Sequence, residues 1–197
     1  MLEYEHVGHM RKASSTSGNK KELTCFLPHH GVIKELSTTT KLRVVFNDSQ
    51  RGMRGASLNN HLLTGPNLLP ALADVLLRTH RYALVADIEK MYRLVLVHPN
   101  DRDLQRILWR NNVNKNIQEF QLNTVTYGLA CAPYLAIRTL RQLANDEGKS
   151  HPLAASALLY DIYVDDILTG APTLSETKEV RAQLAHFCKA GGFLLQK

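Results

Sequence analysis

The stretch that most constrains the fold is Tyr160–Gly170, with the sequence YDIYVDDILTG. Two adjacent aspartates, Asp165 and Asp166, stand between two short apolar runs of β type, which predicts a hairpin with the acidic pair at its tip. Adjacent carboxylates repel each other, so such a tip is either a solvated turn or the holder of a cation. For this pair taken alone, we favour the solvated turn.

A third carboxylate changes that balance. Asp87 directly follows the apolar run YALVA, which predicts a buried strand. If this strand and the hairpin lie side by side in one sheet, Asp87 meets Asp165 and Asp166 at the same edge. Carboxylate oxygens are the ligands that Mg²⁺ takes, and a pair of such ions can activate a 3′-hydroxyl and stabilise a leaving pyrophosphate. The three residues therefore indicate nucleotidyl transfer.

Cationic side chains are expected to face the triphosphate of such a site. Lys41 and Arg43 alternate on the predicted strand KLRVVF, so both side chains point to one face. Arginine suits a bidentate phosphate contact and lysine a point charge. The alternative is an edge strand with solvated charges, and beside the carboxylates the two interpretations are equally supported.

Composition sets outer limits on the class of protein. The chain has 197 residues, of which 44% are hydrophobic, enough to bury a core in one domain or slightly more. Twenty-four basic and 18 acidic residues give a net charge of +6, which favours a polyanionic partner. Three scattered cysteines fit a reducing compartment, and no apolar run approaches the length of a membrane span. We expect an intracellular protein without a membrane partner.

Strand and helix patterns alternate irregularly along the chain, which favours an α+β or mixed sheet domain over a helical bundle or a β-sandwich. Residues 1–10 predict a short helix and residues 11–21 a flexible basic loop. Further helices are predicted at 68–77, 133–146, 151–159 and 174–190, and further strands at 94–97, 105–109 and 117–122. We interpret Trp109 as a packing residue rather than as a platform for a nucleic-acid base.

Taken together, these motifs resemble the reverse transcriptase domain of the BEL/Pao class of LTR retrotransposons. The matching stretches are LPHHGVIKE, TTKLRVVFNDS, SLNNHLLTGPN, VADIEKMYRLVLVHPNDRDLQRILWR, LNTVTYGLACAPYLAIRTLRQLA and YVDDILTG. The resemblance covers residues 26–197 and implies the fingers and palm of a polymerase right hand, with an antiparallel palm sheet and its YVDD hairpin covered by helices. Residues 1–25 form an N-terminal helix and flexible basic loop before it. The thumb, RNase H and integrase of the family are expected to be absent from this chain.

The resemblance also implies roles for single residues. Asp87, Asp165 and Asp166 match the catalytic aspartates, and with the backbone carbonyl of Ile88 they would hold two Mg²⁺ ions, with Mn²⁺ as the alternative. The residues matched to the nucleotide are Lys41 and Arg43 on the triphosphate, Tyr92 against a ribose 2′-hydroxyl, and Tyr127 and Gly128 along the incoming nucleotide. Tyr163 matches a position near the primer terminus. Tyr92 could equally be a core aromatic.

The sequence departs from the family at two positions near these motifs. Asn47 stands where the family usually has Asp, with Asp48 following it, and Cys131 stands where a smaller residue is frequent. Neither change removes an expected metal ligand.

The implied function is an RNA-directed DNA polymerase that uses an RNA or DNA template with a primer and deoxynucleoside triphosphates. It would act in the cytoplasm, with a virus-like particle or the nucleus as alternatives. The missing thumb motivates a second hypothesis, an inactive transposon-derived fragment with weak nucleic-acid binding. A metal-dependent phosphohydrolase would also use carboxylates, but it does not account for Tyr92 or for residues 128–133.

Overall fold

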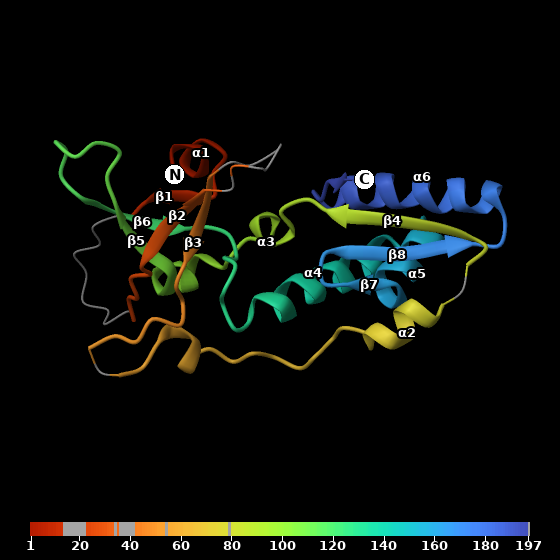
Figure 1. Cartoon of the computed structure of the whole chain (residues 1–197), viewed down its shortest axis with the longest axis horizontal. Coiled ribbons are helices and arrows are strands. Elements are labelled where there is room, and N and C mark those ends of the chain that lie inside the picture. Colours follow the sequence, from red (N-terminus) through yellow and green to blue (C-terminus); the bar gives the residue numbers. More distant parts are fainter. Residues whose placement is uncertain (14–22, 34, 36–41, 54, 79, 197) are drawn as a thin grey trace. The chain divides into compact units, whose positions relative to one another are not determined.

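A computed structural model describes residues 1–13, 23–33, 35, 42–53, 55–78 and 80–196 of the chain (Figure 1). The chain divides into two units, each made from two segments. Unit 1 consists of Met1–Thr64 and Val95–Ala132, and unit 2 of Gly65–Leu94 and Pro133–Lys197. No helix in the described part of the chain is long and apolar enough to cross a membrane.

Unit 1 contains two small antiparallel sheets. The first has the order β1-β6-β5, from β1 (Met10–Lys12), β6 (Gln118–Leu122) and β5 (Arg106–Trp109). The second pairs β2 (His29–Ile33) with β3 (Leu42–Phe46). The short helices are α1 (Leu2–His6), η1 (Leu58–Asn60) and η2 (Pro99–Gln105). Met10, Ile107, Phe120 and Leu122 are buried, so the three-stranded sheet carries much of the core of this unit.

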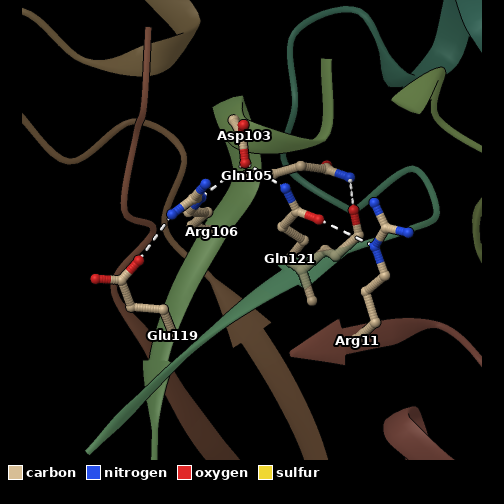
Figure 2. Close-up of polar contacts among 7 residues, drawn as sticks. Arg11, Asp103, Gln105, Arg106, Glu119 and Gln121 are labelled. Atoms are coloured by element: carbon tan, nitrogen blue, oxygen red, sulfur yellow. Dashed lines mark hydrogen bonds and ion pairs between the residues drawn. The ribbon is translucent and has the colours of Figure 1, made fainter. Parts of the chain in front are cut away.

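Polar side chains fasten the three strands of the first sheet to one another (Figure 2). Arg11 on β1 donates from Nε to Gln121 Oε1 on β6 at 3.0 Å, and Gln121 in turn donates to Asp103. Arg106 on β5 pairs with Asp103 at 2.7 Å and with Glu119 at 2.8 Å. The hydrogen bond from Arg106 holds the pKa of Asp103 below its usual value. Arg11 therefore belongs to a strand and links β1 to β6, although its sequence context predicts a loop.

Unit 2 is built on an antiparallel sheet of the order β7-β8-β4-β9. Its strands are β7 (Ile162–Tyr163), β8 (Asp166–Ala171), β4 (Tyr82–Ile88) and β9 (Leu195–Gln196). Its helices are α2 (Leu72–Leu77), α3 (Met91–Leu94), α4 (Ala132–Glu147, whose first residue falls in unit 1), α5 (Pro152–Tyr160) and α6 (Leu174–Ala190). Figure 1 shows α6 running along β4 and β8. Helix α6 packs against both of these strands, and α5 packs against α6 and β8.

The two faces of this sheet differ in burial. On β8 the residues Ile167, Thr169 and Ala171 are buried, whereas the residues between them are half-buried. Successive side chains of a strand point to opposite faces, and directly paired residues share a face. Ile167 pairs with the buried Ala86 of β4, while Asp166 pairs with Asp87. The aspartates therefore lie on the more open face, opposite the buried one.

The predicted α+β class is confirmed, and so are the helices at 133–146, 151–159 and 174–190 and the strands at 105–109 and 117–122. The predicted strand at 94–97 is wrong. The chain turns at Lys90, whose φ is 51°, into α3, which ends at Leu94. Beyond it only an isolated bridge joins Leu96 to Thr124.

Two predicted helices are shorter in the structure. Helix α2 begins only at Leu72, because Pro70 disfavours helical backbone in the residue before it and Ala71 is still extended, with ψ of 133°. At the N-terminus α1 ends at His6, and the chain passes through Gly8, with φ of 78°, into β1. Residues 14–21, which make up most of the predicted basic loop, lie outside the described residues.

Candidate active site

The open face of the unit 2 sheet brings the three predicted carboxylates to neighbouring positions. Asp87 on β4 pairs directly with Asp166 on β8. The backbone N–H of Ile88 donates to the carbonyl of Asp165 at 2.8 Å, which extends the ladder by one residue. Directly opposed residues in an antiparallel pair have Cβ atoms about 5 Å apart, so the carboxylates of Asp87 and Asp166 share one small area of the sheet.

A tight turn carries Asp165 between the two hairpin strands. Tyr163 pairs with Asp166, which leaves Val164 and Asp165 as a two-residue turn. Val164 has φ of 60°. Two-residue hairpin turns require positive φ at the first central residue, and a β-branched side chain there costs about 1–2 kcal/mol. The acidic tip is thus held in a strained conformation by the paired strands on either side.

An ion pair with a buried carboxylate lies at the base of this hairpin. Asp161, just before β7, is 5% exposed, and its carboxylate lies 2.9 Å from Arg78 Nη1. Thr169 on β8 donates from Oγ1 to the other carboxylate oxygen at 2.8 Å. The guanidinium of Arg78 also lies over the ring of Tyr160, 5.4 Å from its centroid. The sequence-based prediction missed this anchor, although an aspartate beside the apolar helix PLAASALLY was a usable signal.

The opposed carboxylates of Asp87 and Asp166 are a candidate site for a cation. Paired carboxylates offer the hard oxygen ligands that Mg²⁺ prefers, so the donor types fit. Within the described residues, however, no three His, Cys, Asp or Glu side chains are gathered closely enough to hold a metal ion. The backbone register therefore places the donors side by side, while their side chains do not form one cluster.

Two tyrosines with predicted roles, Tyr163 and Tyr92, belong to unit 2. Tyr163 is half-buried and lies opposite Asp166 in the hairpin. Tyr92 lies in α3, five residues after Asp87, and is 7% exposed. The turn that leads into α3 contains an ion pair between Lys90 Nζ and Glu89 Oε1 at 3.0 Å. The β4–α3 turn thus sets where Tyr92 stands relative to Asp87.

The other expected nucleotide residues belong to unit 1. Arg43 is exposed on β3, where it pairs with Val32 of β2, while Lys41 lies outside the described residues. Tyr127 is 45% exposed, and Gly128 follows it with φ of 106°, a backbone conformation that favours glycine. Arg43 and Tyr127 are therefore accessible.

Below Gly128 lies a buried carboxyl group to which the sequence-based prediction gave no role. Asp48 is 2% exposed, and neither of its carboxylate oxygens has a hydrogen-bond partner among the described residues. A Cβ added at residue 128 would lie 2.6 Å from Asp48 Oδ2, so the carboxyl group sits directly against the glycine. Burial raises the pKa of Asp48 to about 6. Burial also raises the pKa of Cys131, which disfavours a thiolate there.

A family model described as reverse transcriptase (RNA-dependent DNA polymerase) matches residues 29–197, most of the chain. The chain belongs to the reverse transcriptase family. No curated protein matches it. The reverse transcriptase match begins at the first residue of β2, yet β1, which precedes it, pairs with β6 inside it. The residues before the match therefore contribute a strand to the sheet of unit 1.

Family membership supports the coarser part of the predicted function. The domain is of the RNA-directed DNA polymerase type, and this family works on a primed nucleic-acid template with deoxynucleoside triphosphates. The α+β architecture of antiparallel sheets and helices agrees with the fingers and palm fold that this membership implies.

Proposed function

We propose that this chain extends a primer 3′-hydroxyl on a nucleic-acid template, with Asp87, Asp165 and Asp166 as its catalytic residues. The observation that supports this most strongly is the direct pairing of Asp87 with Asp166 in a member of the reverse transcriptase family. Both residues lie on the open face of their sheet, where a substrate has access. The same register with buried side chains would have indicated packing instead.

The proposed cofactor is a pair of Mg²⁺ ions, with Mn²⁺ as the alternative. The carboxylates of Asp87, Asp165 and Asp166 and the backbone carbonyl of Ile88 would hold them. Bound there, the ions would lower the pKa of the primer hydroxyl and stabilise the charge on the leaving pyrophosphate. The protein's own part is to orient these oxygens, through the β4–β8 register and the anchor between Asp161 and Arg78.

The remaining assignments concern the substrates. Lys41 and Arg43 bind the triphosphate, and Tyr127 and Gly128 line the incoming nucleotide. Tyr92 excludes a ribose 2′-hydroxyl by its bulk, because only that hydroxyl separates the two classes of nucleotide. Tyr163 contacts the primer terminus. The exposure of Arg43 and Tyr127 supports the assignments of these two residues.

A pocket at the end of the β5–β6 hairpin supports a nucleic-acid partner. It has a volume of about 160 Å³, and three cations line it against one carboxylate: Lys12, Arg110, Lys115 and Glu5. Trp109 forms one wall and contacts the ring of Phe120 edge-on, 5.5 Å between centroids. Three cations around one pocket suit the phosphates of a nucleic-acid strand. The net charge of +6 acts in the same direction.

The finer classification rests on the quoted motifs. We propose an origin in a BEL/Pao-class LTR retrotransposon, which implies action in the cytoplasm, in a virus-like particle or in the nucleus. The stretches SLNNHLLTGPN and DIEKMY, together with YVDD, support this class.

Primer extension by the full 197-residue chain tests the function. We expect incorporation of deoxythymidine on an oligo(dT)-primed poly(rA) template with Mg²⁺, and its loss in Asp87→Asn and in Asp166→Asn. Asp101→Asn, on the exposed start of η2, is the matched control and should extend primers like the wild type. A folded wild-type chain that makes no DNA would instead favour the inactive fragment, and extension that survives in both site variants would refute the assignment of the carboxylates.

A further inference from the structure

The side-chain amide of Asn59 is hydrogen-bonded to the backbone of the loop Tyr127–Ala130. Asn59, in the short helix η1, donates from Nδ2 to the carbonyl of Gly128 at 2.8 Å. It accepts at Oδ1 from the backbone N–H of Ala130, also at 2.8 Å. The side-chain amide of Asn59 thus pairs with both the carbonyl of Gly128 and the N–H of Ala130, as the backbone of a neighbouring strand would. The two partners are about 70 residues away in the sequence, so the contact is tertiary.

Asn59 is itself held on its other side. Its Nδ2 also lies 3.0 Å from Ser49 Oγ, and its backbone N–H donates to the carbonyl of Asp48 at 3.2 Å. The segment after β3 and the helix η1 therefore form a support on which the amide is fixed before it reaches the loop. A side chain restrained in this way orders its partner without first losing much freedom of its own.

The loop is also confined from below. The buried carboxyl group of Asp48 lies against Gly128, and only glycine fits both this contact and the backbone φ of 106°. Asn59 therefore fixes the carbonyl of Gly128, while the carboxyl group of Asp48 blocks movement of Gly128 toward the core. Asn59 and Asp48 together define the position and orientation of the loop that carries the exposed ring of Tyr127.

We propose that Asn59 is a positioning residue for nucleotide binding, which acts by holding the Tyr127–Ala130 loop in the orientation that receives a deoxynucleoside triphosphate. This inference rests on the proposed function, because it assigns the loop to the nucleotide. Asn59 itself contacts the loop backbone and needs no contact with the substrate. A change at Asn59 should therefore weaken nucleotide binding more than it slows the chemical step.

The sharpest variant is Asn59→Asp. It keeps the oxygen that accepts from Ala130 but replaces the donor to Gly128 by a second oxygen, so two acceptors face each other across a distance of one hydrogen bond. Loss of one hydrogen bond with an acceptor left unpaired corresponds to about a tenfold weaker interaction. Asn59→Ser removes both hydrogen bonds to the loop without adding charge, and it keeps the test informative if Asn59→Asp folds poorly.

The matched control is the neighbouring residue of the same type. Asn60 accepts at Oδ1 from the backbone N–H and the hydroxyl of Ser57, both at 2.9 Å, so its side chain caps the start of η1. Asn60→Asp keeps that acceptor and makes the same change of charge one residue away. Any difference between the two variants then reports on the loop.

The experiment measures steady-state primer extension and the exchange of the Ala130 amide hydrogen in ¹⁵N-labelled protein. We expect both Asn59 variants to raise the KM for the deoxynucleotide about tenfold, with kcat within about threefold of wild type. Asn59→Ser, which removes the acceptor of the Ala130 amide, should also speed Ala130 exchange about tenfold. Asn60→Asp should leave both quantities unchanged. Faster exchange with an unchanged KM would overturn the inference, and so would an equal rise of KM in Asn60→Asp.

A second measurement separates this inference from the proposed function. Deoxynucleotide binding detected by ligand NMR requires no turnover, so it can be measured even if the wild-type chain extends no primer. Binding by the wild type that weakens about tenfold in Asn59→Ser, but not in Asn60→Asp, supports the inference on its own. A wild-type chain that binds no deoxynucleotide refutes it.

Discussion

Asp87 on β4 and Asp166 on β8 are directly opposed in an antiparallel sheet, so two carboxylates of like charge occupy one cross-strand pair. Such pairs destabilise a sheet, typically by a few tenths of a kcal/mol to about 1 kcal/mol. We therefore expect the stability of unit 2 to respond to the Mg²⁺ ions that we propose this pair helps to bind.

We accordingly expect Asp166→Asn to raise the melting temperature in the presence of a chelator, because the variant removes the repulsion. Added Mg²⁺ should stabilise the wild type and have little effect on the variant, since a ligand that binds only the folded state raises its stability. Differential scanning fluorimetry with and without Mg²⁺ measures both effects. An equal rise with Mg²⁺ in the two proteins would place the cation elsewhere.

Asp48 should give unit 1 an unusual dependence on pH. Its pKa in the folded chain is raised from 3.8 to about 6 by burial, so the folded state favours the protonated form. The stability that the protonated carboxyl group contributes is present below about pH 4, declines as the pH rises toward 6 and is absent above it, a change of about 3 kcal/mol. Asp48→Asn should therefore stabilise the chain at about pH 8 but not at about pH 4.

Urea unfolding of the wild type and Asp48→Asn at both pH values measures this difference. Asn47→Asp is the matched control, because it adds a carboxyl group at the exposed neighbouring position and should not reproduce the effect. Equal stability of Asp48→Asn and wild type at the higher pH would show that Asp48 finds a partner when ionised.

The ion pair between Arg78 and Asp161 should behave as a coupled unit. Arg78→Met removes the cationic partner of the buried Asp161 carboxylate but keeps its hydrogen bond from Thr169, which we expect to cost about 2 kcal/mol. This cost is below the roughly 3–5 kcal/mol of a fully buried pair, because the Arg78 side chain is 44% exposed and solvent screens its charge. The double variant Arg78→Met, Asp161→Asn should be less destabilised than the sum of the single changes. Strict additivity in urea unfolding would argue against the coupling.

Replacement by glycine should destabilise the protein less at Val164, in the hairpin turn, than at Val85, in strand β4. Val164→Gly removes the steric cost of a positive φ and offsets the usual entropic cost of glycine, so we expect stability within about 0.5 kcal/mol of wild type. Val85→Gly on β4, 45% exposed and without such strain, should cost about 1 kcal/mol. The melting temperatures of Val164→Gly and Val85→Gly measure this difference. An equal decrease in melting temperature for the two variants would show that the strain at Val164 is small.

The pocket at the β5–β6 hairpin should contribute to template binding through charge. Replacing Arg110 and Lys115 by glutamine should weaken binding of a single-stranded template and reduce the salt dependence, by about 0.7 in the logarithmic slope for each phosphate that is no longer neutralised. Fluorescence anisotropy at several salt concentrations measures the slope. The same double change at Lys178 and Arg181, exposed on α6, is the control, and an equal reduction there would indicate a general effect of net charge.

Local patterns in the sequence were enough to predict the long elements. The helix α4 follows from the spacing of Ala136, Leu140 and Leu143 after Pro133, and β4 from the compact run YALVA. The proximity of Asp87 to Asp165 and Asp166 could be predicted only if their strands were assumed to be neighbours, because no local sequence pattern shows which strands pair. The register that places Asp166, rather than Asp165, opposite Asp87 came from the structure.

Other features depend on contacts that no sequence window contains. Strand β1 is three residues long and forms because β6 offers it a partner, so its periodicity is too short to detect. The support of the Tyr127 loop joins Asn59 to Gly128 across 69 positions, and asparagine in a polar stretch usually marks a turn. The apolar run at 94–97 wrongly predicted a strand, because Val95 is buried without belonging to one.

The division of unit 2 into two sequence segments has a consequence for how the protein forms. Residues 95–132, which belong to unit 1, separate β4 from β8 along the chain. During synthesis Asp87 therefore emerges long before the strand that receives it, and β4 must wait for β8 with its hydrogen-bonding edges unpaired. Pairing across such a separation is slow, and an unpaired apolar strand is prone to aggregate. The β4–β8 step should thus limit the rate at which newly made chains mature.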